Sequence, residues 1–346
     1  MKNNYQQLLT QIENKEKITF GLLLDKKGSA PQVPGASALF NQQGLLHGTL
    51  GGGILEMKAE ELAVSHWPAK DNQLCEVDYT SDIGEDTGAI CGGIATFLLD
   101  FNPEASLSTF KAMHSDLKLN KSGYLLSRIN KNNPNKINRS WVTNPILEDE
   151  VNEAIATLKD NETSALINKN DDLIFIEYLS PAPQLLIVGA GHIGQALCHQ
   201  GALLNFNVSV VDNRPKYAKQ SLVPDADLLI IEPNLKDGIQ QLNIDTNTYV
   251  VIVTQGHKSD CEALQCVIKS KATYIGMIGS KRKIQQVKGD FIKRSICSEE
   301  EFNQIYAPIG LNIGSKTVQE IAISIAAELI AERNRKKNVR FIDIRN

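Results

Sequence analysis

The chain has 346 residues, of which 42% are hydrophobic and 22% charged, and its formal net charge is −4. This composition is that of a folded globular protein, and the length indicates two domains of roughly 150–180 residues. The charge balance offers no broad basic surface for nucleic acid. The longest apolar run, LLIVGAG at 185–191, is too short to span a bilayer, and residues 1–17 lack the apolar core of a signal peptide. We therefore expect a cytoplasmic protein with no membrane or nucleic-acid partner.

The cysteines are scattered, and none forms a C-x-x-C pair. This spacing argues against a disulfide framework and against a compact zinc site. Most of them are expected to be small buried side chains. The six are Cys75, Cys91, Cys198, Cys261, Cys266 and Cys297.

The first half of the chain mixes short strands with helices, which is an α+β pattern. Runs rich in β-forming residues predict strands, and apolar residues at helical spacing predict helices. The expected strands are 17–25, 37–50 with a turn at 41–44, 73–80, 89–100 and 172–179, and the expected helices are 54–67, 106–119 and 146–158.

The segment SPAPQ at 180–184 carries two prolines that can continue neither a helix nor a central strand, so we interpret it as a linker. After it, nearly continuous apolar runs alternate with glycine turns and helical stretches, as in parallel sheets that are buried on both faces. The sequence therefore predicts an α/β protein. We expect an N-terminal α+β domain at 1–179, a C-terminal Rossmann-like doubly wound parallel sheet at 185–335, and a tail at 336–346.

Residues 189–194, GAGHIG, match the dinucleotide fingerprint G-x-G-x-x-G directly after a predicted strand and at the start of a helix. The first glycine allows the tight turn, the second allows a phosphate to approach the backbone, and the third allows the helix to pack on the strand. The amides at the helix start then face an anion. The residues that we expect to contact a nucleotide are Gly189, Gly191, His192 and Gly194.

The choice of nucleotide depends on Asp212, at the end of the next predicted strand, and on Arg214. Asp212 is placed to accept hydrogen bonds from a ribose hydroxyl, as in NAD sites. Arg214 could instead favour an additional phosphate, so the choice between NAD and NADP stays open. The alternative is a compact Rossmann turn whose glycines serve only the fold.

Two further glycine turns follow predicted strands. Gly256 and His257 precede Asp260, which could form an acid–base or metal pair with His257; we favour Asp260, or Ser259, as the cap of the following helix. Gly279 and Ser280 precede the cations at 281–283. Ligands of open α/β sheets lie beyond the carboxyl ends of the strands, so these turns and the fingerprint should share one edge.

The motifs taken together resemble the XdhC/CoxI family, the maturation factors of xanthine dehydrogenase and related molybdenum hydroxylases. The resemblance covers most of the chain. It departs from the family at several positions, among them Ser37, where arginine is usual, and Gln255, where histidine is frequent. The motifs are GSAPQVPGA (28–36), GGGILE (51–56), CGG (91–93), GAGHIGQAL (189–197), VVDNRPKYA (210–218), VTQGHKSDCEAL (253–264), YIGMIGSKRK (274–283) and APIGLNIG (307–314).

The resemblance implies that the chain binds molybdenum cofactor (molybdopterin) and delivers it to a molybdenum hydroxylase apoenzyme. It also implies that a cysteine desulfurase supplies sulfur to the bound cofactor. Glycine-rich loops can bring backbone amides close to such an anionic group. The N-terminal residues implied in cofactor binding are Gly28, Ser29, Gly35, Gly51, Gly52, Gly53, Glu56, Cys91 and Gly92.

Two of these residues have alternative interpretations. Cys91 lies beside a glycine pair, where a thiol could contact molybdenum or relay sulfur, or could be a small packed side chain. Glu56 could orient the glycine loop, contact the pterin, or complement the dipole of the helix that it begins.

Two rival functions remain from the sequence. The first is an NAD(P)-dependent oxidoreductase that uses the C-terminal domain with His257 as the acid. The second is a redox- or nucleotide-sensing module without cofactor transfer. We expect a cofactor chaperone, and we also expect a homodimer, because the last predicted helix, which contains Ile321, Ile325 and Leu329, is apolar on more than one side.

Overall fold

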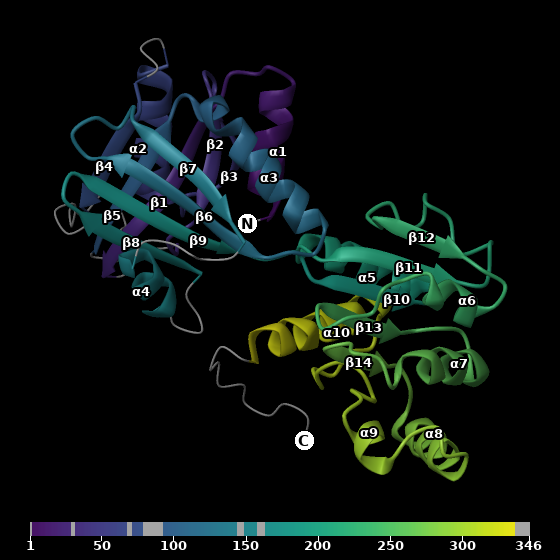
Figure 1. The fold of residues 1–346 in the computed structure, drawn as a ribbon. Helices are drawn as coiled ribbons and strands as arrows, with labels where there is room; N and C mark the ends of the chain where they lie inside the picture. Colours follow the sequence, from purple (N-terminus) through teal and green to yellow (C-terminus); the bar gives the residue numbers. More distant parts are fainter. Residues whose placement is uncertain are drawn as a thin grey trace. The chain divides into compact units, whose positions relative to one another are not determined.

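The structure is a computed structural model that describes residues 2–28, 32–67, 71–78, 93–143, 149–157 and 163–335. It divides into two compact units, Met1–Pro181 and Ala182–Asn346 (Figure 1). The first is built on antiparallel sheets and the second on a parallel sheet, which confirms the predicted fold class. No helix among the described residues is long and apolar enough to cross a membrane.

The first unit contains two antiparallel sheets. Sheet A has the strand order β3-β2-β1-β5-β4, and sheet B has the order β7-β6-β9-β8. Sheet A consists of β1 (Thr19–Gly28), β2 (Ser37–Asn41), β3 (Gly44–Gly48), β4 (Gln73–Asp78) and β5 (Gly93–Asp100). Sheet B consists of β6 (Gly123–Asn130), β7 (Ile137–Val142), β8 (Ser164–Lys169) and β9 (Asp172–Leu179). The helices are α1 (Lys2–Glu13), α2 (Gly53–Ser65), α3 (Leu107–Lys118) and α4 (Asp149–Thr157), with a 3₁₀ turn at Pro103–Ser106.

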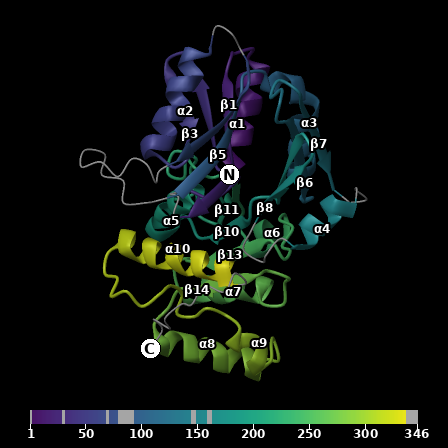
Figure 2. The ribbon, with the colours of Figure 1, turned by 90° about the vertical axis from the view of Figure 1, so that its left-hand side faces the viewer.

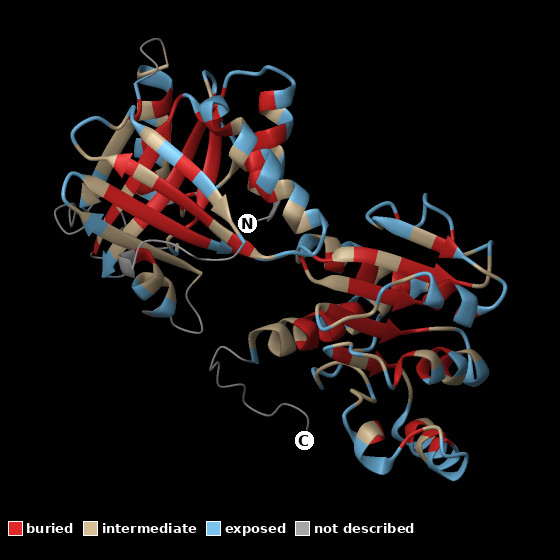
Figure 3. Cartoon of the chain, in the orientation of Figure 1, coloured by how far each residue is buried: buried red, intermediate tan, exposed pale blue. Residues whose placement is uncertain are grey.

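The alternation of side chains along β1 explains how these layers pack. Phe20 and Leu22 point to a core that sheet B, α1 and α3 complete, whereas Leu23 points to the opposite face, which α2 covers. Helix α4 packs on the other side of sheet B. Figure 3 shows that buried residues concentrate in the sheets and on the inner faces of the helices. The sequence did not predict α1, although Tyr5, Leu8 and Ile12 form its buried stripe.

The second unit is a doubly wound sheet of five parallel strands in the order β12-β11-β10-β13-β14. Helices α5 and α10 cover one face, and α6, α7 and α8 cover the other (Figures 1 and 2). The strands are β10 (Gln184–Val188), β11 (Asn207–Asp212), β12 (Leu228–Ile231), β13 (Thr248–Ile252) and β14 (Tyr274–Met277). The helices are α5 (His192–Leu203), α6 (Leu235–Gln240), α7 (His257–Val267), α8 (Lys281–Lys293), α9 (Glu299–Asn303) and α10 (Val318–Asn334).

A polar cluster lies buried between the sheets of the first unit. Arg139 on β7 donates to Asp100 at 2.6 Å and to Ser106 at 3.3 Å. Glu177 on β9 is 2% exposed and accepts a hydrogen bond of 2.6 Å from the hydroxyl of Tyr5 on α1. The second carboxylate oxygen of Glu177 has no hydrogen-bond partner among the described residues. Because Arg139 is already paired with Asp100, Glu177 has no counterion of its own within the described part of the chain.

This environment raises the pKa of Glu177. Burial, which disfavours the charged carboxylate, has the largest effect; the hydrogen bond from Tyr5 and the charge of Arg139 act in the opposite direction but do not cancel it. The pKa rises from 4.5 to about 7. The folded chain therefore retains a proton on Glu177 over a pH range in which the unfolded chain has lost it.

The first prediction follows from this difference. Because the pKa is higher in the folded state, the contribution of Glu177 to stability is complete below pH 4.5 and is lost as the pH rises toward about 7. As the pH rises from 5 to 8, the parent chain should lose about 2 to 3 kcal/mol of unfolding free energy. The Glu177→Gln variant cannot ionise and should not show this loss. Urea unfolding followed by tryptophan fluorescence measures this, because both tryptophans, Trp67 and Trp141, lie in the first unit.

The control for this experiment is Tyr5→Phe, which removes the hydrogen bond that lowers the pKa of Glu177. It should shift the pH dependence to higher pH without abolishing it. An equal pH dependence in the parent chain and in Glu177→Gln would contradict the assignment.

Candidate functional site

The pairing of β1 with β5 brings two distant glycine motifs together. The register runs from Phe20↔Asp100 at one end to Gly28↔Gly93 at the other. Gly28, with φ 78°, therefore lies beside Gly93, the last residue of the CGG motif. Ser29, Cys91 and Gly92 lie outside the described residues.

A second glycine of the same motif, Gly35, lies beside Leu23 in the middle of β1. The amide of Gly35 donates to the carbonyl of Leu23 at 2.8 Å, and its φ is 91°, which favours glycine. Sheet B also contacts this loop, because the hydroxyl of Ser164 at the start of β8 donates to the carbonyl of Pro34 at 3.1 Å. The loop that contains Gly35 is thus attached to both sheets.

The triple glycine lies near the loop of Gly35. Thr49, just before it, donates its amide to the carbonyl of Ser37 at 3.1 Å. Gly51, Gly52 and Gly53 have φ values of 130°, 69° and 57°, in the left-handed region that side chains rarely adopt. A Cβ added at Gly52 or Gly53 would have no heavy atom within 4 Å. The turn therefore leaves an open space over the start of α2 that a ligand could occupy.

Glu56 supports the triple glycine from within α2. One oxygen of its carboxylate accepts from the hydroxyl of Thr49 at 2.5 Å and from the amide of Leu50 at 2.9 Å. The hydroxyl of Thr49 in turn accepts from the amide of Gly51 at 3.0 Å. Of the three interpretations offered by the sequence, these contacts favour the one in which Glu56 orients the loop.

Two cations at the end of β1 were not predicted from the sequence. Lys26 and Lys27 are the last residues of β1 before Gly28, where the strand becomes exposed. Their position next to the glycine motif was the signal that could have identified them. They place positive charge beside Gly28, whereas position 37, where arginine is usual in the family that the motifs resemble, is serine.

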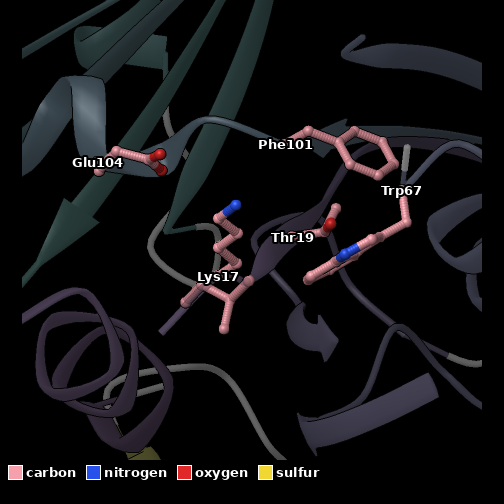
Figure 4. Close-up of a pocket in the computed structure, with 6 residues that line it drawn as sticks. Lys17, Thr19, Trp67, Phe101 and Glu104 are labelled. Atoms are coloured by element: carbon pink, nitrogen blue, oxygen red, sulfur yellow. The ribbon is translucent and has the colours of Figure 1, made fainter. Parts of the chain in front are cut away.

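A pocket in the first unit lies at the opposite end of sheet A (Figure 4). It includes Thr19 at the start of β1 and Phe101 after β5, whereas the glycine turns lie near Gly28 and Gly93. The pocket and the glycine turns are therefore separate features. Its lining residues are Lys17, Ile18, Thr19, Trp67, Phe101 and Glu104.

In the second unit, the fingerprint glycines take the conformation that a Rossmann turn requires. Gly189 has φ 116°, and a Cβ there would come within 2.6 Å of the carbonyl oxygen of Val253. A Cβ on Gly194 would come within 1.9 Å of the carbonyl oxygen of Gly189. Gly191 caps α5, and His192 is exposed at the first position of the helix. Residues 189–194 thus form a close strand-to-helix turn.

Asp212 at the end of β11 is 1% exposed and fully engaged in hydrogen bonds. It accepts from the amide of Ala190 at 2.6 Å and from the amide of Arg214 at 2.8 Å. The guanidinium of Arg214 contributes two more hydrogen bonds, from Nε at 2.9 Å and from Nη2 at 2.7 Å. Burial raises the pKa of Asp212, but the hydrogen bonds from Arg214 and Ala190 together outweigh it, so that the pKa lies below its usual value.

Arg214 also reaches across the fingerprint turn. Its Nη1 donates to the side-chain oxygen of Gln255, which follows β13, at 2.5 Å. Its guanidinium lies 4.6 Å from the centre of the Tyr217 ring, and its Nη2 is 4.0 Å from where a Cβ of Gly191 would be. The residue therefore connects the turns after the two strands that flank β10.

A second carboxylate–cation pair lies at the same edge of the sheet. Asp260 is fully buried and accepts from the amide and the hydroxyl of Thr254, and the ammonium of Lys283 forms a short ion pair with it. The predicted helix cap is wrong: α7 begins earlier, at His257 with Gly256 as its N-cap, so Asp260 lies within the first turn. The buried ion pair explains the position of this aspartate instead.

The remaining predicted residues lie at the ends of the same parallel strands. Gly256, with φ 98°, and His257 are exposed after β13. Ser280 caps α8 by accepting from the amide of Lys283 at 3.2 Å, and Gly279 precedes it. The side chain of His257 has the thiol of Cys261 as its neighbour at 3.7 Å. Within the described ranges, no group of three or more histidine, cysteine or acidic residues could hold a metal ion.

These features define a two-unit protein with glycine turns at one end of an antiparallel sheet and a Rossmann turn in a second, parallel sheet. Known protein families contain the same combination of an N-terminal unit and a Rossmann unit. Residues 12–78 match the family described as XdhC and CoxI, and residues 185–329 match the XdhC Rossmann domain. The chain therefore belongs to the XdhC/CoxI family, as the sequence motifs indicated.

Individual relatives extend the comparison. The chain is 26% identical, over 97% of its length and 99% of the relative's, to a protein of Bacillus subtilis (strain 168) described as a probable xanthine dehydrogenase subunit. It is 32% identical over 161 residues to the uncharacterized protein YqeB of Escherichia coli (strain K12), but these cover only 29% of YqeB. A crystal structure described as a xanthine dehydrogenase from Bacillus halodurans shares the fold, with a TM-score of 0.79 and 23% identity over 98% of both chains.

The open space over the triple glycine gives a second prediction. Gly53→Ala should cost about 1 to 2 kcal/mol of stability, which is the strain of the left-handed backbone alone. Gly48→Ala should cost about 3 kcal/mol or more, because its Cβ would also lie 2.5 Å from the carbonyl oxygen of Ser37. Urea unfolding followed by tryptophan fluorescence compares the two. An equal loss of stability would mean that the space over Gly53 is not open.

Proposed function

We propose that this chain binds molybdenum cofactor and delivers it to a xanthine dehydrogenase-type molybdenum hydroxylase. Membership of the XdhC/CoxI family and the full-length likeness to the Bacillus subtilis relative support an accessory role for such an enzyme. The binding and delivery of the cofactor are the specific part of the proposal.

The glycine turns that border sheet A carry the proposal. Gly28 ends β1 beside Gly93, Gly35 and the triple glycine lie beside the middle of β1 and the start of β2, and the space over Gly52 and Gly53 is open. Molybdenum cofactor is a pterin with a dithiolene and a phosphate, so it presents anionic groups. Backbone amides in successive left-handed and turn conformations bind such groups, and only glycine allows so close an approach.

Other residues beside the glycine turns fit the same ligand. Lys26 and Lys27 supply positive charge beside Gly28. Glu56 holds the glycine turn through Thr49 and Leu50, so that part of the site is ordered before the ligand arrives. A turn ordered in advance reduces the entropy that binding must offset.

We assign Cys91 to contact with the molybdenum, or to the relay of sulfur to it, on the resemblance to the family. Cys91 precedes Gly93, the first residue of β5, by two positions, and Gly93 pairs with Gly28. A cysteine desulfurase is the partner that this role requires. That enzyme and the homodimer stay predictions.

The oxidoreductase alternative has less support. It would use His257 as the acid, but Asp260, which could have paired with His257, is held by Lys283 and Thr254 instead. His257 is exposed, with the thiol of Cys261 as its neighbour. We therefore favour a role in which the chain holds a cofactor for another enzyme.

The third prediction tests binding. In an anaerobic calorimetric titration of the full chain with molybdenum cofactor, the parent chain should bind, and Gly53→Ala should bind at least about tenfold more weakly, because its methyl group enters the space of the ligand. Cys91→Ser should also bind more weakly. The matched control is Gly289→Ala on the exposed side of α8, where an added Cβ again meets no atom within 4 Å.

Two results would overturn the proposal. One is the absence of cofactor binding by the parent chain under these conditions. The other is equal binding by Gly53→Ala and Gly289→Ala, which would remove the triple glycine from the site. Far-UV circular dichroism of each variant verifies that a loss of binding is not a loss of fold.

A further inference from the structure

The hydrogen bonds of Asp212 bear on which ligands the Rossmann unit can hold. In sites of this fold that bind NAD, the acidic residue at the end of the second strand reads the ribose through its hydroxyl groups. That role requires carboxylate oxygens with free acceptor positions. An ionised carboxylate has about four such positions, two on each oxygen.

In this chain all four acceptor positions of Asp212 are filled from within the fold. One oxygen accepts from the amide and from Nε of Arg214, and the other accepts from the amide of Ala190 and from Nη2 of Arg214. The side chain of Asp212 is 2% exposed. A ribose hydroxyl could bond to it only after the guanidinium had moved away.

Several contacts oppose that movement. The guanidinium forms a bidentate, charge-assisted pair with a buried carboxylate, the strongest kind of side-chain hydrogen bonding. It also bonds to Gln255 at 2.5 Å and lies over the ring of Tyr217. Displacement would leave a buried charge without its partner, which is a costly state in a protein interior.

We propose that Arg214 determines the ligand specificity of the Rossmann unit by closing Asp212 to ribose hydroxyls. The unit therefore does not recognise NAD, or any other nucleotide, through its ribose diol. Of the five N–H groups of Arg214, three are used by Asp212 and Gln255 among the described residues. The residue facing a ligand at this turn is thus a hydrogen-bond donor with a positive charge, which suits an anionic group. This inference holds whether or not the first unit binds molybdenum cofactor.

The test compares NAD with its 2′-deoxyadenosine analogue, which lacks one of the two ribose hydroxyls. Binding of each to the full chain is measured by calorimetry in the parent chain, in Arg214→Ala and in Lys216→Ala. Lys216 is a matched control, because it is an exposed cation near Arg214 that contacts the ring of Tyr217 and does not bond to Asp212. Its loss changes the net charge by the same amount.

The parent chain and the Lys216→Ala variant should have no higher affinity for NAD than for the analogue, and an absence of binding to both compounds meets the same expectation. Arg214→Ala, with Asp212 open, should gain at least about tenfold in affinity for NAD and should prefer it to the analogue by a similar factor. Arg214→Gln, which keeps a polar side chain, is the second variant should the alanine variant fold poorly by circular dichroism.

Two outcomes would overturn the inference. A parent chain that prefers NAD to the analogue would mean that Asp212 reads the ribose despite Arg214. Folded Arg214 variants that gain no affinity for NAD would mean that Arg214 is not what closes the site.

Discussion

The antiparallel pairing of β1 with β5 is the constraint on which the first unit depends. Its register fixes both ends of sheet A at once. At one end it sets Asp100 beside Phe20, within the buried cluster that Arg139 and Glu177 complete. At the other end it sets Gly28 beside Gly93. A shift of one residue would turn the core side chains to the wrong face and would also change the residue that Gly28 faces. The proposed cofactor site therefore depends on the same pairing as the hydrophobic core.

The second unit uses buried carboxylate–cation pairs where a nucleotide-binding enzyme would keep polar groups open. Asp212 with Arg214 and Asp260 with Lys283 each hold a turn at the carboxyl edge of the parallel sheet. Both pairs contact neighbouring residues of one loop, since Gln255 accepts from Arg214 and Thr254 donates to Asp260. The edge at which the fold usually binds ligands is in this way fixed by internal contacts. This arrangement is consistent with a domain that retains the Rossmann fold but not its common ligand.

Local signals made much of the fold predictable. The hairpin at 37–50 follows from its turn residues, and the capping box at the start of α10 follows from the spacing of Thr317 and Glu320. Contacts between distant residues could not be predicted, because a single sequence does not give the register that creates them. The bond between Tyr5 and Glu177 joins residues 172 positions apart, and the pair of Asp260 with Lys283 spans 23 positions. For Asp212, the sequence correctly indicated the position at the end of a strand but not the arginine that fills its acceptor positions.

The most direct test of the account is transfer of the cofactor to an enzyme. The full chain is loaded anaerobically with molybdenum cofactor that already carries its sulfido ligand, separated from free cofactor, and mixed with a xanthine dehydrogenase apoenzyme that lacks it. The account predicts that hydroxylase activity appears, and that it appears faster than with the same amount of free cofactor. Activity that never appears, or that appears at the rate of free cofactor, would contradict the proposed delivery.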